Sequence, residues 1–165
     1  MTDIPDLIHS LSHGPYVLNS LIELIPEQRY QERRLPDRWS VHEQVCHLVD
    51  AQTILMQRFE YFAEFDAPHI SAHEPESEPD PDRYLKMDLQ RALSEFPIIR
   101  AEMVTLLQSY PEDYWLKQGT HDVFSPYSSK QLLIHTLNVD YTHFFSIEQL
   151  GFTNQGLESN ILTVL

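Results

Sequence analysis

The spacing of apolar residues constrains the fold of this chain more than any other feature of its sequence. Four stretches carry aliphatic and aromatic residues at intervals of three and four, which places them on one face of an α-helix: residues 4–26, 40–65, 83–109 and 128–150. Hydrophobic residues make up 42% of the chain, enough for a core. Four glycines among 165 residues are too few for a barrel or sandwich rich in turns. The pattern predicts an all-α fold, a four-helix bundle in one domain over residues 1–165.

Local signals predict where two helices begin and where one ends. Ser40 is followed three residues later by Glu43, and Ser128 is followed by Gln131, so each pair has the form of a capping box. Gly151 is predicted to end the last helix, because glycine readily adopts the backbone conformation found just past a helix C-terminus.

Prolines predict irregular points inside two of the helices. Gly14-Pro15 lies within the first helical stretch, and Pro97 lies within the third. Proline lacks the backbone N–H that continues a helix, so we expect the first helix to bend or break and the third to kink.

A proline-rich acidic stretch, residues 66–82, separates the second and third helices. It suits a long crossover loop rather than a tight hairpin. His69 and His73 lie near Glu74 and Glu76 and could be drawn as a surface metal site. We interpret the stretch as a solvated connection, because runs of charge usually face water.

The charge excludes some classes of partner. There are 25 acidic residues against 11 basic ones, a net charge of −14, which argues against binding to nucleic acid or to anionic membranes. The single cysteine, Cys46, excludes an internal disulfide. No run of 18 apolar residues is present, and the N-terminus does not read as a signal peptide. We therefore expect a cytoplasmic protein.

Histidines are the candidate functional residues. His47 has apolar neighbours at helical spacing, so it is expected to face the core. His135 and His143 are eight residues apart, which on a helix means about 80° and about 12 Å, too far for both to bind one metal ion. His135 is expected to face away from His143 and to serve in packing or capping. The position one turn before His143 is Val139, which offers no ligand.

Carboxylates could complete a metal site. Asp140 lies three residues before His143, and Asp50 lies three residues after His47, and either spacing is usable on one helix face. The chain can therefore offer two inward histidines from two helices with a carboxylate as a third ligand. Three protein ligands and an open position are typical of catalytic zinc sites.

Two segments carry a resemblance to a known family. "RWSVHEQVCHLVDAQ" resembles the second-helix signature of the DinB/YfiT-like superfamily. That signature places a tryptophan, a serine cap, a glutamate, a His-Leu pair and an acid in order, here Trp39, Ser40, Glu43, His47, Leu48 and Asp50. The region from "EDYW" through "GTH" to "SSKQLLIHTLNVDYTHFFSIEQL" is similar to the end of the family's domain. The resemblance covers residues 4–150.

The resemblance implies a four-helix bundle with a long crossover, often a homodimer, and a divalent metal held by three histidines. Carried over to this sequence, the metal ligands are His47 and His143, and the third position is Val139. Asp140 matches the acid that follows the missing histidine. His121, in "GTH", matches a histidine often seen before the last helix, and we expect it to serve only in loop packing.

These expectations lead to two hypotheses about function. In the first, the protein holds Zn or Ni at a degenerate site and acts on a small-molecule substrate as a thiol-dependent transferase or a metal-assisted hydrolase. In the second, it is a non-catalytic dimeric bundle that has lost metal binding. Val139 is the residue that favours the second hypothesis.

Overall fold

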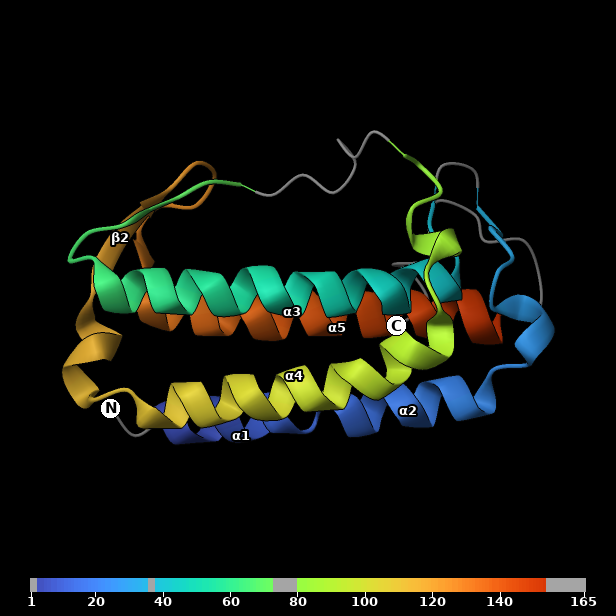
Figure 1. Cartoon of the computed structure of the whole chain (residues 1–165), viewed down its shortest axis with the longest axis horizontal. Helices are drawn as coiled ribbons and strands as arrows, with labels where there is room; N and C mark the ends of the chain where they lie inside the picture. The colour runs from blue at the N-terminus through green and yellow to red at the C-terminus, as the bar shows by residue number, and fades with distance from the viewer. Residues whose placement is uncertain (1–2, 36–37, 73–79, 154–165) are drawn as a thin grey trace.

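The computed structural model describes residues 3–35, 38–72 and 80–153. The predicted four-helix bundle is confirmed, with the first helix divided in two (Figure 1). The α-helices are α1 (Ile4–Ser12), α2 (Gly14–Leu24), α3 (Val41–Glu64), α4 (Leu89–Ser109) and α5 (Ser129–Phe152). His73, Glu74 and Glu76, which could be drawn as part of a surface metal site, lie outside the described residues. Within the described ranges, no helix combines the length and apolar character needed to cross a bilayer.

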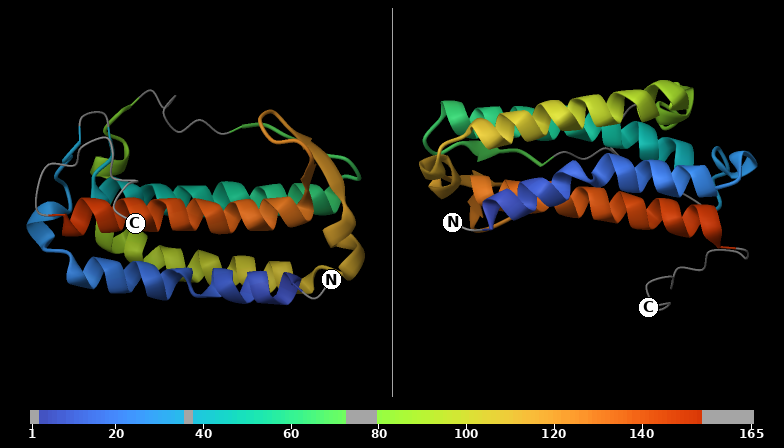
Figure 2. Two further views of the ribbon diagram at one scale, coloured as in Figure 1. Left: turned by 180° about the vertical axis from the view of Figure 1, so that it is seen from behind. Right: turned by 90° about the horizontal axis from the view of Figure 1, so that it is seen from below.

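The helices pack in two layers, one of α3 and α5 and the other of α4 with α1 and α2, and the neighbours within each layer are antiparallel (Figure 1, Figure 2). α3 contacts both α4 and α5, and α1 contacts the same two helices from the other side of the bundle (Figure 2). The buried apolar residues form two clusters. One includes Phe62 and Trp115 and lies towards the C-terminal end of α3, and the other includes Phe96 and Ile147. The core therefore runs along the bundle and fixes the mutual position of α3 and α5.

Short elements join the helices. Three 3₁₀-helices, η1 (Glu27–Arg29), η3 (Tyr84–Lys86) and η4 (Glu112–Leu116), lie in the connections. A small sheet has the order β1 (His69–Ile70), β2 (Gln118–His121) and β3 (Tyr127–Ser128), with β1 parallel and β3 antiparallel to β2. We expected only a loop over residues 66–82, where β1 lies. The sheet ties the beginning of the crossover to the segment before α5 and brings His121 to the side of the bundle.

The cap predictions are confirmed in part. Ser40 Oγ accepts a hydrogen bond from the Glu43 N–H, and the Glu43 carboxylate accepts one from the Ser40 N–H, a complete capping box. At α5, Ser128 Oγ accepts from the Gln131 N–H, as expected. The Gln131 side chain instead donates to the carbonyl of Pro126, so the second half of that box is not formed.

Two predicted helix ends were wrong. α4 begins at Leu89 and not near residue 83, because Asp88 caps it by accepting from the Arg91 N–H. Gly151 lies inside α5, which continues to Phe152. The physical reason for a glycine there is packing, since a Cβ at this position would overlap the buried side chain of Ile25.

The predicted break in the first helix is confirmed. α1 ends at Ser12 and α2 begins at Gly14. Gly14 also lies against the core, where an added Cβ would be 2.9 Å from Nη1 of Arg100. Pro97 lies inside α4, which continues past it to Ser109.

Candidate functional site

His47 of α3 and His143 of α5 face one another. Their ring centroids are 4.7 Å apart with the planes tilted by 51°. Trp39, just before α3, packs against both rings, 4.6 Å from His47 and 6.4 Å from His143 between centroids. Sequence analysis expected the two histidines to point inward from two helices, and the fold brings them together.

Hydrogen bonds fix the orientation of both rings. Nδ1 of His143 lies 2.5 Å from Oε1 of Gln44. Because an amide oxygen only accepts, Nδ1 of His143 carries the proton and Nε2 is the basic nitrogen. Nδ1 of His47 lies 3.2 Å from the hydroxyl of Tyr84, a buried residue of η3. Metal-binding histidines usually engage the second ring nitrogen in this way, which fixes the tautomer and the ring direction.

Burial keeps His143 neutral. Desolvation lowers the pKa of His143 from its ordinary value of 6.5 to about 4. A neutral imidazole is the form that binds metal, so the ring needs no deprotonation at pH 7.

The spacing of the two rings fits one shared metal ion. With metal–nitrogen bonds of about 2.1 Å, two imidazole centres on one ion lie about 4.5 to 5.2 Å apart for bond angles between about 90° and the tetrahedral value. The observed 4.7 Å falls within that interval. Two of the ligands implied by the resemblance are therefore compatible with a metal.

The third ligand is missing. Val139 lies beside the two histidines on the wall of the same cavity, where it presents only hydrocarbon. Asp140 is buried and paired with Arg100 of α4, and Asp50 is paired with Arg83. Both carboxylates that sequence analysis considered are thus engaged by arginines. In the described part of the chain, no group of three His, Cys, Asp or Glu residues could hold a metal ion.

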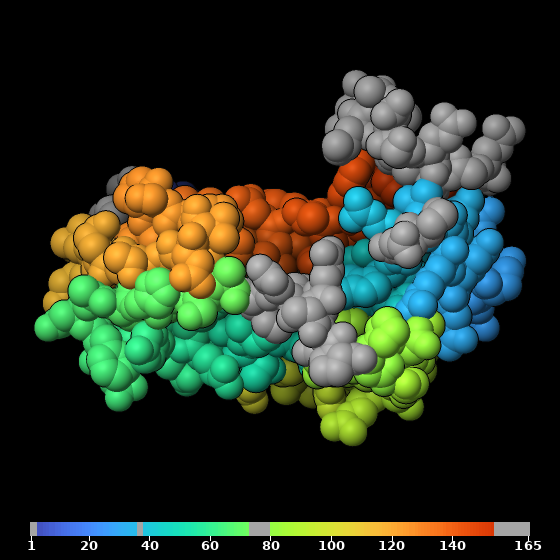
Figure 3. Space-filling model, turned by 90° about the horizontal axis from the view of Figure 1, so that it is seen from above, coloured from blue at the N-terminus to red at the C-terminus, as the bar shows by residue number. Residues whose placement is uncertain are grey.

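A cavity of about 370 Å³ lies beside the histidine pair, between α3, α5 and the segment around β2. Figure 3 views the face of the molecule on which these three parts meet. Four histidines line it: His47, His121, His135 and His143. We refer to it as the histidine cavity.

The expectation that His135 faces away from His143 was wrong. His135, Val139 and His143 lie along one stripe of α5, and all three line the histidine cavity. An offset of about 80° excludes two ligands on one metal but still leaves both side chains on one wall of a cavity. The sequence did contain this signal, because His135, Val139 and His143 follow one another at intervals of four residues.

His121 packs in the loop, as expected, and is also part of the cavity wall. Its ring packs on Phe124 and Tyr127, with centroids 4.9 and 4.7 Å away, and it also lines the histidine cavity. β2 places it there. A four-residue strand has too few positions to be recognised by periodicity, and only the resemblance at "GTH" pointed to this histidine.

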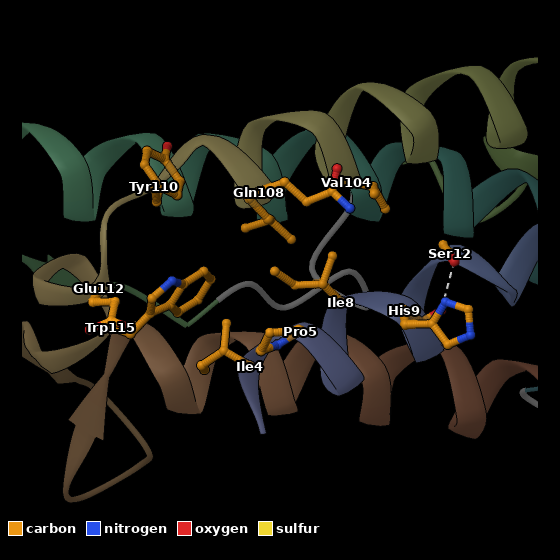
Figure 4. A pocket seen from close by; sticks show the side chains of 11 residues that line it. Ile4, Pro5, Ile8, His9, Ser12, Val104, Gln108, Tyr110, Glu112 and Trp115 are labelled. Carbon is orange, nitrogen blue, oxygen red and sulfur yellow. Dashed lines mark hydrogen bonds between the residues drawn. The ribbon is translucent and has the colours of Figure 1, made fainter. Parts of the chain in front are cut away.

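A second cavity, of about 310 Å³, lies between α1, the end of α4 and η4 (Figure 4). Its wall includes Ile4, Ile8 and Trp115, together with His9 and Glu112. With one histidine, and a glutamate at its exposed edge, it offers less chemistry than the histidine cavity, which is therefore the candidate functional site.

Comparisons with known proteins agree with this fold. Residues 10–144 match the sequence model of the DinB superfamily. Among solved structures, YfiT from Bacillus subtilis superposes with a TM-score of 0.78 at 17% sequence identity, covering 91% of this chain and 86% of that one. YfiT is described as a probable metal-dependent hydrolase with an unusual four-helix bundle topology. No curated protein sequence matches the chain significantly.

Proposed function

Because the chain belongs to the DinB superfamily, we propose that it binds a small molecule in the histidine cavity beside a divalent metal held by His47 and His143. The observation that carries the proposal is the pair itself. The two rings lie 4.7 Å apart, and each has its Nδ1 engaged by a neutral partner. Both histidines also line the same cavity, where a small molecule could reach a metal held between them.

Metal-assisted hydrolysis is the activity we favour for this site. When bound, a divalent metal supplies Lewis-acid polarisation and a bound water of lowered pKa. Gln44 and Tyr84 orient the two imidazoles, and Trp39 shields them from solvent. Val139 leaves one more position of the metal without a protein ligand. The description of YfiT, a protein of the same fold, as a probable metal-dependent hydrolase supports this choice over a thiol-dependent transfer.

Calorimetric titration of metal-free protein with Zn²⁺ and Ni²⁺ tests the proposal. We expect one ion per chain, bound in the micromolar range, with loss of binding in His47→Ala and in His143→Ala. His9→Ala is the matched control, because His9 of α1 and His13, which follows this helix, form an exposed pair with ring centroids 4.5 Å apart. Binding that disappears in His9→Ala and survives in His47→Ala would locate the metal on the surface and contradict the proposal.

The alternative is a bundle that has lost its metal chemistry. Val139 favours it, since the histidine cavity presents hydrocarbon where the resemblance implies a third imidazole. Absence of binding at about 1 mM Zn²⁺ would select this alternative. The homodimer that the resemblance implies stays a prediction. Size-exclusion chromatography with light scattering would measure the molar mass of the protein in solution.

A further inference from the structure

Among the residues that the structure describes, the wall of the histidine cavity carries no carboxylate. In a chain with 25 acidic and 11 basic residues, this is a local reversal of charge. The ionisable residues that line the cavity are Arg58 and the four histidines. A cavity of this kind favours an anion inside a molecule whose surface is strongly acidic.

Arg58 supplies the positive charge. It lies on α3, half-buried, and one of its N–H groups donates to the carbonyl of Ser71 at 2.8 Å. A guanidinium has five N–H donors, and among the described residues Arg58 makes no other hydrogen bond and no ion pair. Burial lowers the pKa of Arg58, as expected for a cation removed from water without a carboxylate beside it.

His121 adds a donor. Its Nδ1 accepts hydrogen bonds from the backbone N–H groups of Val123 at 3.0 Å and Phe124 at 3.4 Å. A ring nitrogen that accepts carries no proton, so the proton of the neutral ring is on Nε2. Desolvation and the charge of Arg58 lower the pKa of His121, while the carboxylate of the neighbouring Asp122 acts in the opposite direction. His121 therefore offers an N–H donor rather than a metal ligand.

His135 is the third polar group. It is half-buried, its ring lies 5.2 Å from that of Phe124, and it makes no hydrogen bond to any residue that the structure describes. Burial and the charge of Arg58 lower the pKa of His135 as well. An imidazole in a cavity without a protein partner is available to a ligand.

The remainder of the wall is apolar. Leu55 and Val139 line the histidine cavity from the helices, and Val123 and Phe124 line it from the loop after β2, where they are 69% and 44% exposed. Large apolar side chains so exposed beside a concave surface are typical of a binding site.

We propose that the histidine cavity binds a small organic monoanion, a carboxylate whose head meets Arg58, His121 and His135 and whose apolar body lies against Phe124 and Val139. The single formal charge of Arg58 matches one negative charge, whereas a dianionic phosphate would require more. A guanidinium also matches the geometry of a carboxylate with two parallel hydrogen bonds. This inference rests on the proposed function, which selects the cavity, and it names the class of substrate that would bind there. Binding of the anion does not require the metal.

The test uses benzoate and its uncharged analogue benzamide as probes of metal-free, isotope-labelled protein followed by two-dimensional NMR. We expect benzoate to shift the amides of residues 121–124 and 135–143 and to bind about tenfold more tightly than benzamide. Arg58→Gln is expected to weaken benzoate about tenfold and to leave benzamide unchanged. Arg58→Lys, which keeps the positive charge, is expected to weaken benzoate binding less than Arg58→Gln does. Arg91→Gln removes an equal charge from an exposed site on α4 and is expected to have no effect.

Equal binding of benzoate and benzamide would overturn the inference, as would unchanged benzoate affinity in Arg58→Gln. So would the absence of shifts with benzoate, butyrate and hexanoate at about 10 mM. The zinc titration of Arg58→Gln separates this inference from the proposed function. If the protein binds zinc but no carboxylate, only the proposed anion site is overturned. If it binds carboxylates but no zinc, only the proposed metal site is overturned.

Discussion

Asp140 and Arg100 form a buried two-point ion pair between α5 and α4. The guanidinium donates to both carboxylate oxygens at 2.6 and 2.9 Å, and the side chains are 2% and 1% exposed, respectively. Arg100 also donates to Oε1 of Gln52 on α3 and to the carbonyl of Leu11 at the end of α1. The pair thus joins four helices at the point where the first helix breaks, just before Gly14. Its role is structural, and Asp140 is not the substitute metal ligand that its position beside His143 suggested.

Asp140→Asn is expected to lower the free energy of unfolding by about 3–5 kcal/mol, because Arg100 would remain buried without its counter-charge. Urea denaturation followed by circular dichroism measures the change. Asp113→Asn, at an exposed carboxylate, is the matched control and should change the value by less than about 0.5 kcal/mol. Normal stability combined with loss of zinc binding in Asp140→Asn would restore Asp140 as a ligand.

Val139→His should raise the affinity for zinc at least about tenfold, since it adds a third imidazole one turn before His143 on the wall shared with His47. Competition with a chromogenic zinc chelator would measure the gain. Ile134→His, which places an imidazole on the exposed face of the same helix, should give no such gain. If both variants behaved alike, the ligand positions carried over from the resemblance would be wrong.

The long helices and the histidine pair could be predicted from the sequence because both depend on local spacing. The apolar stripes set which face of α3 and α5 turns inward, and this alone directs His47 and His143 to the same core. The partner of Asp140 could not be predicted in this way. Arg100 lies 40 residues away on another helix, and no local pattern distinguishes a buried arginine from an exposed one.

The anion-favouring character of the histidine cavity was also beyond sequence analysis. The net charge of −14 describes the whole surface, whereas the cavity collects Arg58, His121 and His135 from α3, β2 and α5. Two of the three strands that arrange this meeting are two residues long, too short to show a period of two. The net charge argued against nucleic acid and anionic membranes as partners, but it carries no information about a cavity that the fold assembles locally.

Glu43 makes stability depend on pH. Burial alone would raise the pKa of Glu43, but hydrogen bonds from Arg33 and Ser40 lower it below its ordinary value of 4.5. A carboxylate with a lowered folded-state pKa stabilises the protein above its unfolded-state pKa, and this contribution is lost as the pH falls through the folded-state value. Unfolding should therefore become easier below about pH 4.5.

Glu43→Gln isolates this contribution, because glutamine keeps a side-chain acceptor for the Ser40 N–H and removes the ion pair with Arg33. We expect a loss of about 1–3 kcal/mol at pH 7 and a smaller difference from the wild type at pH 3. Glu148→Gln, at an exposed glutamate of α5, is the control for one fewer carboxylate. A difference between Glu43→Gln and wild type that stays constant from pH 7 to pH 3 would contradict the assignment.

Gly151→Ala tests why a glycine occupies the last turn of α5. On helix propensity alone the change should stabilise the protein by up to about 1 kcal/mol. The added Cβ would overlap Cγ1 and Cδ1 of Ile25, a buried side chain at the end of α2, so we expect a net loss of about 1–3 kcal/mol instead. Thermal and urea unfolding measure this loss, with Thr142→Ala on the exposed face of α5 as the control.

The double variant tests the contact with Ile25 directly. Ile25→Ala removes the overlapping atoms, so in that background Gly151→Ala should raise the free energy of unfolding. Additive losses in the double variant would show that Gly151 is needed for a reason other than contact with Ile25.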